Sequence, residues 1–82
     1  MRVRVNFYGV LKEDVGTART DVELDHEQPT IADLTARLAE DHPALASRLS
    51  STAFAVGNRV VDRTFTLADG AQVDLLPPVS GG

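Results

Sequence analysis

The chain ends in six residues whose types and order suit chemistry at the terminus itself, Pro77-Pro78-Val79-Ser80-Gly81-Gly82. No side chain between Leu75 and Gly82 is charged, so the one charge of this segment is the terminal carboxylate, whose ordinary pKa is about 3.5. Gly81 and Gly82 have no Cβ atom, so a partner protein can close tightly around their backbone. We therefore expect a narrow, neutral tail that enters a channel with its anion leading.

The Gly82 carboxylate needs activation, because a carboxylate is a poor acyl donor until one of its oxygens becomes part of a leaving group. Reaction with ATP supplies that leaving group by forming an acyl-adenylate. A sulfur donor could then convert the acyl-adenylate to a thiocarboxylate, which carries sulfur although the chain has no cysteine. We expect Gly82 to be the reactive position, first as an acyl-adenylate and then as a thiocarboxylate.

The residues before Gly81 are expected to present the tail. Pro77-Pro78 stiffens the exit from the last strand and reduces the entropy lost when the tail is held extended. Val79-Ser80 is small enough to pass through a channel. If Val73 and Leu75 face inward, Leu76 faces outward and is a candidate docking contact for a partner.

Other reactive side chains are weaker candidates. Ser80 lacks the nucleophile-elbow sequence of a hydrolase, and no histidine lies near it in sequence. His26 and His42 are not at helical spacing and have no cysteine to support them, so no metal site is expected. The acidic pairs Glu13-Asp14 and Glu40-Asp41 lack the pattern of a calcium loop and are expected to be solvated.

The composition is that of one small globular domain. The chain has 82 residues, 43% of them hydrophobic and 24% charged, and a net charge of −4. The absence of a basic run argues against nucleic-acid binding, and no apolar run approaches the roughly 20 residues of a membrane helix. The first residues, Met1 to Val5, alternate like a strand and not like a signal sequence, so the cytoplasm is the expected location.

Alternating apolar residues predict five strand segments, around residues 2–8, 22–24, 53–56, 60–61 and 73–75. In the first segment the odd positions are expected to face inward. Gly57-Asn58 predicts a two-residue hairpin turn between the third and fourth segments, and Asp69-Gly70 predicts a turn before the last.

Helical spacing of apolar residues predicts one long helix over residues 30–41. Thr30 can cap its N-terminus, Asp33 lies in the first turn, where the helix dipole favours an anion, and Pro43 forces the end. Shorter helical turns are expected within 9–17 and 44–49. The order of elements predicts an α+β roll in which a mixed sheet packs on one main helix, with a domain over 1–76 followed by the tail, 77–82.

Four stretches of the sequence carry a resemblance to a known family. They are residues 74–82 (DLLPPVSGG), 6–16 (NFYGVLKEDVG), 54–58 (FAVGN) and 67–70 (LADG). The chain resembles the ubiquitin-like sulfur-carrier family, and within it the small subunits of molybdopterin synthases, over essentially its whole length. The resemblance implies a β-grasp fold.

The resemblance also implies a reaction partner at each step. An activating enzyme would use ATP to adenylate Gly82, and a sulfur donor would thiocarboxylate it. The tail would then insert into the large synthase subunit and donate sulfur to cyclic pyranopterin monophosphate. Two small subunits would sit at the ends of a large-subunit dimer, forming a heterotetramer. This chain would bind no cofactor and would be a non-catalytic donor, active only with the large subunit.

The sequence departs from the family pattern at three places, and other functions stay open. Ala71 replaces the second Asp of an Asp-Gly-Asp turn, Gly57-Asn58 replaces the commoner Asn-Gly, and Leu76 stands where an aromatic residue is common. The chain could instead carry sulfur for thiamine, another sulfur-containing metabolite, cysteine or tRNA thiolation, although thiamine-type carriers usually lack the proline pair. It could also be a ubiquitin-like protein modifier, for which Lys12 would be the single site of lysine-linked chains.

Overall fold

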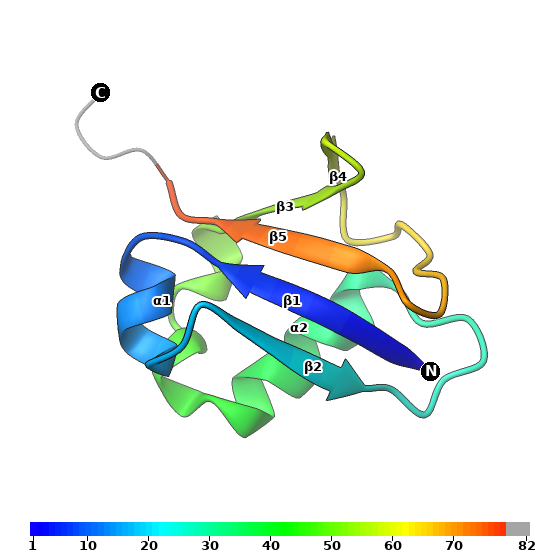
Figure 1. Cartoon of the computed structure of the whole chain (residues 1–82), viewed down its shortest axis with the longest axis horizontal. Helices are drawn as coiled ribbons and strands as arrows, with labels where there is room; N and C mark the ends of the chain where they lie inside the picture. Colours follow the sequence, from blue (N-terminus) through cyan, green and yellow to red (C-terminus); the bar gives the residue numbers. More distant parts are fainter. Residues whose placement is uncertain (79–82) are drawn as a thin grey trace.

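The first and last strands of the chain lie side by side in the middle of one five-stranded sheet, with the helices behind it (Figure 1). The computed structural model describes residues 1–78. The elements are β1 (Arg2–Phe7), α1 (Val10–Val15), β2 (Arg19–Glu23), α2 (Ile31–Asp41), η1 (Pro43–Leu45), η2 (Leu49–Ser51), β3 (Ala53–Val56), β4 (Arg59–Val61) and β5 (Gln72–Leu76).

The sheet is mixed, with strand order β2-β1-β5-β3-β4. β1 pairs with β2 in antiparallel and with β5 in parallel register, and β3 pairs in antiparallel with both β4 and β5. This is the β-grasp arrangement, so the predicted fold class is confirmed. The parallel β1–β5 pair joins the first strand of the chain to the last. The periodicity of the sequence did not indicate that these two strands are neighbours.

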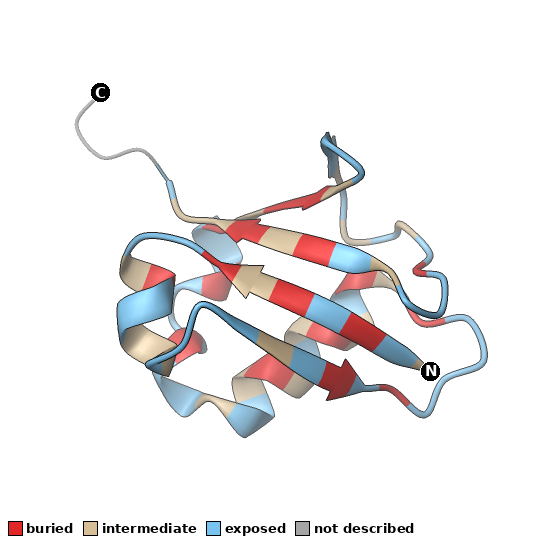
Figure 2. Ribbon diagram, in the orientation of Figure 1, coloured by how far each residue is buried: buried red, intermediate tan, exposed pale blue. Residues whose placement is uncertain are grey.

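One face of the sheet is packed against the helices, and the other is open to solvent. Figure 2 shows buried and exposed residues alternating along β1 and β5, as expected for strands covered on one side. In β1 the odd positions are the buried ones, as predicted. The buried apolar core consists of Val3, Val5, Phe7, Leu11, Val22, Leu24, Ile31, Leu34, Leu38, Leu45, Leu49, Phe54, Leu67, Val73 and Leu75.

The main helix begins at a reciprocal cap, which confirms the predicted boundary. The Thr30 hydroxyl accepts a hydrogen bond from the Asp33 backbone N–H (3.3 Å), and the Asp33 carboxylate accepts one from the Thr30 backbone N–H (2.8 Å). These bonds satisfy donors that a helix start would otherwise leave unpaired. The helix ends at Asp41, with His42 as its C-terminal cap, and the predicted turn after Pro43 forms two short 3-10 helices.

The predicted hairpin turn is also confirmed. Gly57 and Asn58 have φ angles of 59° and 65°, and the flanking residues Val56 and Arg59 are register partners in β3 and β4. Positive φ at both central residues is the signature of the primed turn that suits the twist of a hairpin.

Candidate functional site

The tail leaves the sheet from the end of a central strand. On β5, Leu75 pairs with Phe7 of β1, and Leu76 pairs with Ala53 of β3. Pro77 follows and has no N–H to continue either ladder, so strand pairing ends there. β5 is paired with β1 as far as Leu75 and with β3 as far as Leu76, so the root of the tail has a fixed position and direction.

The structure describes the tail as far as Pro78, and Val79, Ser80, Gly81 and Gly82 lie outside the described residues. The chemistry assigned to Gly82 and the passage of the other three through a channel therefore stay predictions. Of the two prolines, Pro77 is half-buried and Pro78 is exposed.

Gly9 lies directly against the tail root, and sequence reasoning missed it. Its backbone has φ 56° and ψ −132°, a conformation that residues with a side chain rarely adopt. A Cβ atom built on Gly9 would lie 3.1 Å from Cγ of Pro77, so the absence of a side chain lets Pro77 pack directly on the start of α1. A glycine placed between a predicted strand and a predicted helix was the signal that could have found it.

Leu76 lies on the open face of the sheet, half-buried, beside a group of apolar side chains. Strand register aligns Leu76 with Ala53, and Ala55 with Val60, on this face. Tyr8 directly follows Phe7, the last residue of β1, whose register partner Leu75 directly precedes Leu76. We call this group the docking strip and define it as Tyr8, Ala53, Ala55, Val60 and Leu76.

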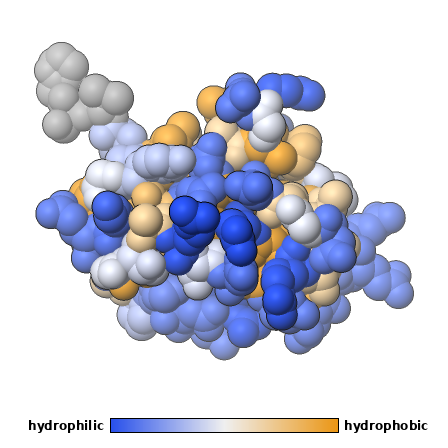
Figure 3. All heavy atoms as spheres, in the orientation of Figure 1, coloured by the Kyte–Doolittle hydropathy of each residue, from blue (hydrophilic) through white to orange (hydrophobic). Residues whose placement is uncertain are grey.

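The docking strip contains the two exposed large hydrophobic side chains found among residues 1–78. Tyr8 is 47% exposed and Val60 is 72% exposed. Figure 3 shows hydrophobic side chains on this face towards the tail and beside the β3–β4 hairpin, with hydrophilic ones across the middle. Apolar side chains in water next to a tail suit contact with a protein partner. The docking role predicted for Leu76 remains a prediction. The structure adds Ala53 as its register partner, and Val60 lies two strands away on the same face.

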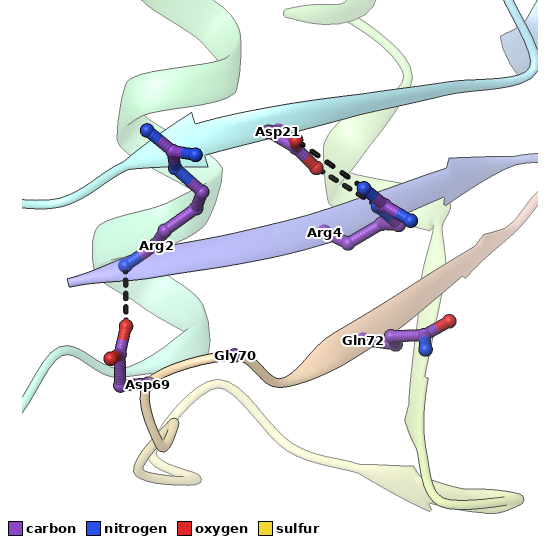
Figure 4. Close-up of a pocket in the computed structure, with 6 residues that line it drawn as sticks. All are labelled: Arg2, Arg4, Asp21, Asp69, Gly70 and Gln72. Atoms are coloured by element: carbon purple, nitrogen blue, oxygen red, sulfur yellow. Dashed lines mark hydrogen bonds and ion pairs between the residues drawn. The ribbon is translucent and has the colours of Figure 1, made fainter.

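The other end of the open face is polar (Figure 4). Here a shallow pocket of about 390 Å³ is lined by Arg2, Arg4, Asp21, Asp69, Gly70 and Gln72. Arg4 donates from Nε and Nη2 to the two carboxylate oxygens of Asp21, at 2.9 and 3.4 Å. This contact holds the pKa of the Asp21 carboxyl below its usual value. Asp69 accepts a hydrogen bond from the Arg2 backbone N–H at 2.8 Å.

Two of the charged side chains that line this pocket, Arg4 and Asp21, form an ion pair with each other. Arg2 also approaches Glu23, with Nε 3.6 Å from a carboxylate oxygen. Paired, exposed charges stabilise a surface weakly. The pocket is an open, polar part of the exposed sheet face.

The two histidines lie at opposite ends of α2. His26 Nε2 is 3.6 Å from an Asp33 oxygen at the start of α2. His42 lies at the other end of α2, with its ring 6.2 Å from the ring of Phe7 in an edge-on arrangement. In the part of the chain that the structure describes, no three His, Cys, Asp or Glu side chains gather as metal ligands. None of the helices within residues 1–78 is long and apolar enough to cross a membrane.

The fold and the exposed tail root define a ubiquitin-like β-grasp protein. The crystal structure of the protein SAMP1 from Haloferax volcanii superposes on it with a TM-score of 0.89 over the full length of both chains, at 26% identity. A complex of subunits 1 and 2 of the molybdopterin-converting factor from Helicobacter pylori contains a chain that matches with a TM-score of 0.73. That match covers both chains completely at 29% identity.

The chain belongs to the ThiS family, whose sequence profile matches residues 5–82. It is 35% identical to the molybdopterin synthase sulfur carrier subunit of Escherichia coli (strain K12), over 98% of this chain and 99% of that one. It is 33% identical to the subunit of the same name from Chlamydomonas reinhardtii, over the full length of both. The family expected from the tail and the three internal stretches is confirmed.

Proposed function

We propose that this protein is the sulfur carrier subunit of a molybdopterin synthase. The observation that carries the proposal is the end-to-end match to two relatives of that name, 35% and 33% identical, with the Gly-Gly tail inside the matched region. The fold is the β-grasp fold, and the matching Helicobacter pylori chain was solved together with a second subunit.

The proposed chemistry takes place at Gly82 in two stages. In an activating enzyme, the Gly82 carboxylate attacks ATP, forming an acyl-adenylate and releasing pyrophosphate. A sulfur donor then displaces AMP and leaves a thiocarboxylate. The chain has no cysteine, so the sulfur it carries is held at the terminus and cannot be lost to a side-chain disulfide.

In the second half of the cycle, the large synthase subunit receives the tail and the thiocarboxylate donates its sulfur to cyclic pyranopterin monophosphate. The large subunit supplies the catalytic side chains, and this chain supplies sulfur at a defined position. The docking strip supports this division, because it offers an apolar contact next to the fixed root of the tail. We place the reaction in the cytoplasm, in a complex of two small and two large subunits.

Reconstitution tests the proposal. The protein is thiocarboxylated, its intact mass is measured to verify replacement of one oxygen by sulfur, and it is mixed with a large subunit and the pyranopterin precursor. We expect molybdopterin to form in proportion to the thiocarboxylate supplied. A chain lacking Gly81-Gly82 is the matched control, since it keeps every described element and should give no product. A confirmed thiocarboxylate that yields no molybdopterin would contradict the proposal.

A second candidate function is protein modification. The likeness to SAMP1 favours it, because a further Haloferax volcanii structure that shares the fold bears the name small archaeal modifier protein 1. A modifier would form an isopeptide bond between Gly82 and a lysine of a target protein. Peptide mass spectrometry of cell extracts distinguishes the two functions, because a branched peptide at a target lysine reports conjugation. Sulfur transfer to thiamine, cysteine or tRNA would appear instead as consumption of the thiocarboxylate without molybdopterin.

A further inference from the structure

A second surface flanks the tail root, on the side away from the docking strip. It is a pocket of about 370 Å³ lined by Val10, Leu11, Arg48, Ser51, Pro77 and Pro78. Val10 and Leu11 come from α1, Arg48 and Ser51 from the segment around η2, and the prolines from the tail. We call it the tail-root pocket. Its walls are apolar, and its polar groups come from Arg48 and Ser51.

The walls of the tail-root pocket are held in place by contacts within the domain. Leu11 is fully buried in the core, and Pro77 packs on Gly9 as described above. Arg48 donates from Nε to the carboxylate of Asp14, whose side chain is only 18% exposed. The carbonyl oxygen of Arg48 accepts a hydrogen bond from the hydroxyl of Thr52, the C-terminal cap of η2, at 2.8 Å, which closes the turn around η2. The pocket is therefore formed before any partner arrives.

Arg48 is positioned at this pocket with part of its guanidinium group available. Its side chain is 45% exposed. Within the described part of the chain, its side chain donates only through Nε, so the terminal N–H groups point to solvent or to a partner. An arginine fixed by one carboxylate loses less conformational freedom when it pairs with a second one.

The position of the pocket indicates what occupies it. Leu76 of the docking strip and Pro77 of the pocket are neighbours in sequence, so a protein that takes hold of the tail passes over both surfaces. A partner that covered only the docking strip would leave the apolar pocket wall in water at the point where the tail must be held. The related Helicobacter pylori chain was solved in a complex with a second subunit, which makes the large subunit the partner to consider.

We propose that the tail-root pocket receives one apolar side chain of the large synthase subunit, next to a carboxylate that pairs with Arg48. The large subunit then grips the tail root from both faces, through the docking strip on one and the tail-root pocket on the other. This inference rests on the proposed function. Burial of one leucine-sized side chain corresponds to a change of about 10- to 150-fold in the dissociation constant.

Filling the pocket from its rim tests the proposal. Ser51→Trp puts a large side chain at the mouth of the pocket, and Ser50→Trp is the matched control, since Ser50 is exposed on the same 3-10 helix but does not line the pocket. We expect Ser51→Trp to weaken calorimetric binding of the full chain to the large subunit by about 10-fold or more. Ser50→Trp should bind like wild type, and both variants should melt within a few degrees of the wild-type protein.

Arg48→Gln should also weaken binding to the large subunit and reduce the salt dependence of that binding.

Each outcome bears on one of the two proposals. Equal binding by Ser51→Trp and Ser50→Trp, with both folded, overturns the tail-root pocket as a contact. Normal binding by Ser51→Trp with loss of adenylation overturns the choice of partner, because the occupant would then belong to the activating enzyme. Failure of the wild-type protein to bind the large subunit overturns the proposed function itself, and the inference with it.

Discussion

Replacing Gly9 by alanine is expected to damage stability and tail placement together. Gly9 precedes α1 with φ 56° and ψ −132°, and its missing Cβ leaves room for Pro77. Alanine at this position is expected to destabilise the fold in two ways. Its own backbone is strained, and its Cβ, at 3.1 Å from Pro77 Cγ, requires the proline to move by a few tenths of an ångström.

The stability part of this effect can be given a magnitude. A residue with a side chain in a sparsely populated backbone region costs about 1–3 kcal/mol. For a domain of this size, each kcal/mol lowers the melting temperature by roughly 4–8 °C. A central cost of about 2 kcal/mol therefore predicts a fall of about 8–16 °C in Gly9→Ala.

Gly16 provides the matched control for this measurement. It caps the C-terminus of the same helix with φ 86° and ψ 7°, and a Cβ built on it has nothing within 4 Å. Gly16→Ala should lose about 1–2 kcal/mol from backbone strain alone, without displacing the tail. Melting temperatures come from circular dichroism, and binding to the large subunit is measured well below both of them.

We expect both variants to melt early and only Gly9→Ala to bind the large subunit more weakly. A Gly9→Ala protein that melts like wild type would refute the reasoning about backbone strain. A destabilised Gly9→Ala that binds as well as Gly16→Ala would show that the contact between residue 9 and Pro77 does not position the tail.

Three further predictions concern the main helix. Leu38 is fully buried, so Leu38→Ala should lower the free energy of unfolding by about 2–5 kcal/mol in urea denaturation, through lost apolar burial and a residual cavity. Thr30→Ala removes the hydroxyl of the reciprocal cap and should cost about 1 kcal/mol in the same assay, with Thr30→Ser close to wild type. Hydrogen bonds from Thr30, the backbone N–H first, lower the pKa of the Asp33 carboxyl from its ordinary value of 3.8. Its contribution to stability is therefore complete only well above the unfolded-state pKa of 3.8, and it is lost as the pH falls through the lowered value. Asp33→Asn should reduce the dependence of stability on pH in that acidic range and leave the rest of the profile unchanged.

Each of these predictions has a result that contradicts it. A loss below about 1 kcal/mol in Leu38→Ala would mean that the core closes around the gap. Equal losses in Thr30→Ala and Thr30→Ser would assign the effect to packing and not to the cap. An unchanged acid profile in Asp33→Asn would show that other carboxylates control acid unfolding.

Local sequence patterns predicted most elements of the fold correctly. The helix over 30–41, its cap at Thr30 and the turn at Gly57-Asn58 all depend on interactions between residues close in sequence, so composition and spacing suffice to find them. The alternation of buried positions in β1 and β5 was predictable for the same reason.

The order of the strands and the surroundings of the tail could not be predicted from local patterns. The β1–β5 pair brings together Asn6 and Asp74, which are 68 residues apart and share a hydrogen bond of 2.9 Å. Periodicity reports which way a side chain faces but not which strand lies beside it. The roles of Gly9 and of the two surfaces flanking the tail therefore emerged only in three dimensions.

The sequence by itself determined the chemistry expected of this protein. That chemistry needs only the Gly81-Gly82 terminus, the uncharged residues before it and the two prolines. All of these are covalent properties of the chain. The tertiary structure decided what surrounds the root of the tail, at Pro77 and Pro78. It places the tail root beside Leu76 and Ala53 on one face, and beside Val10 and Arg48 on the other. Contacts between segments distant in sequence form only when the apolar faces of sheet and helices are buried together, so the surfaces offered to a partner follow from folding and not from any single stretch of sequence.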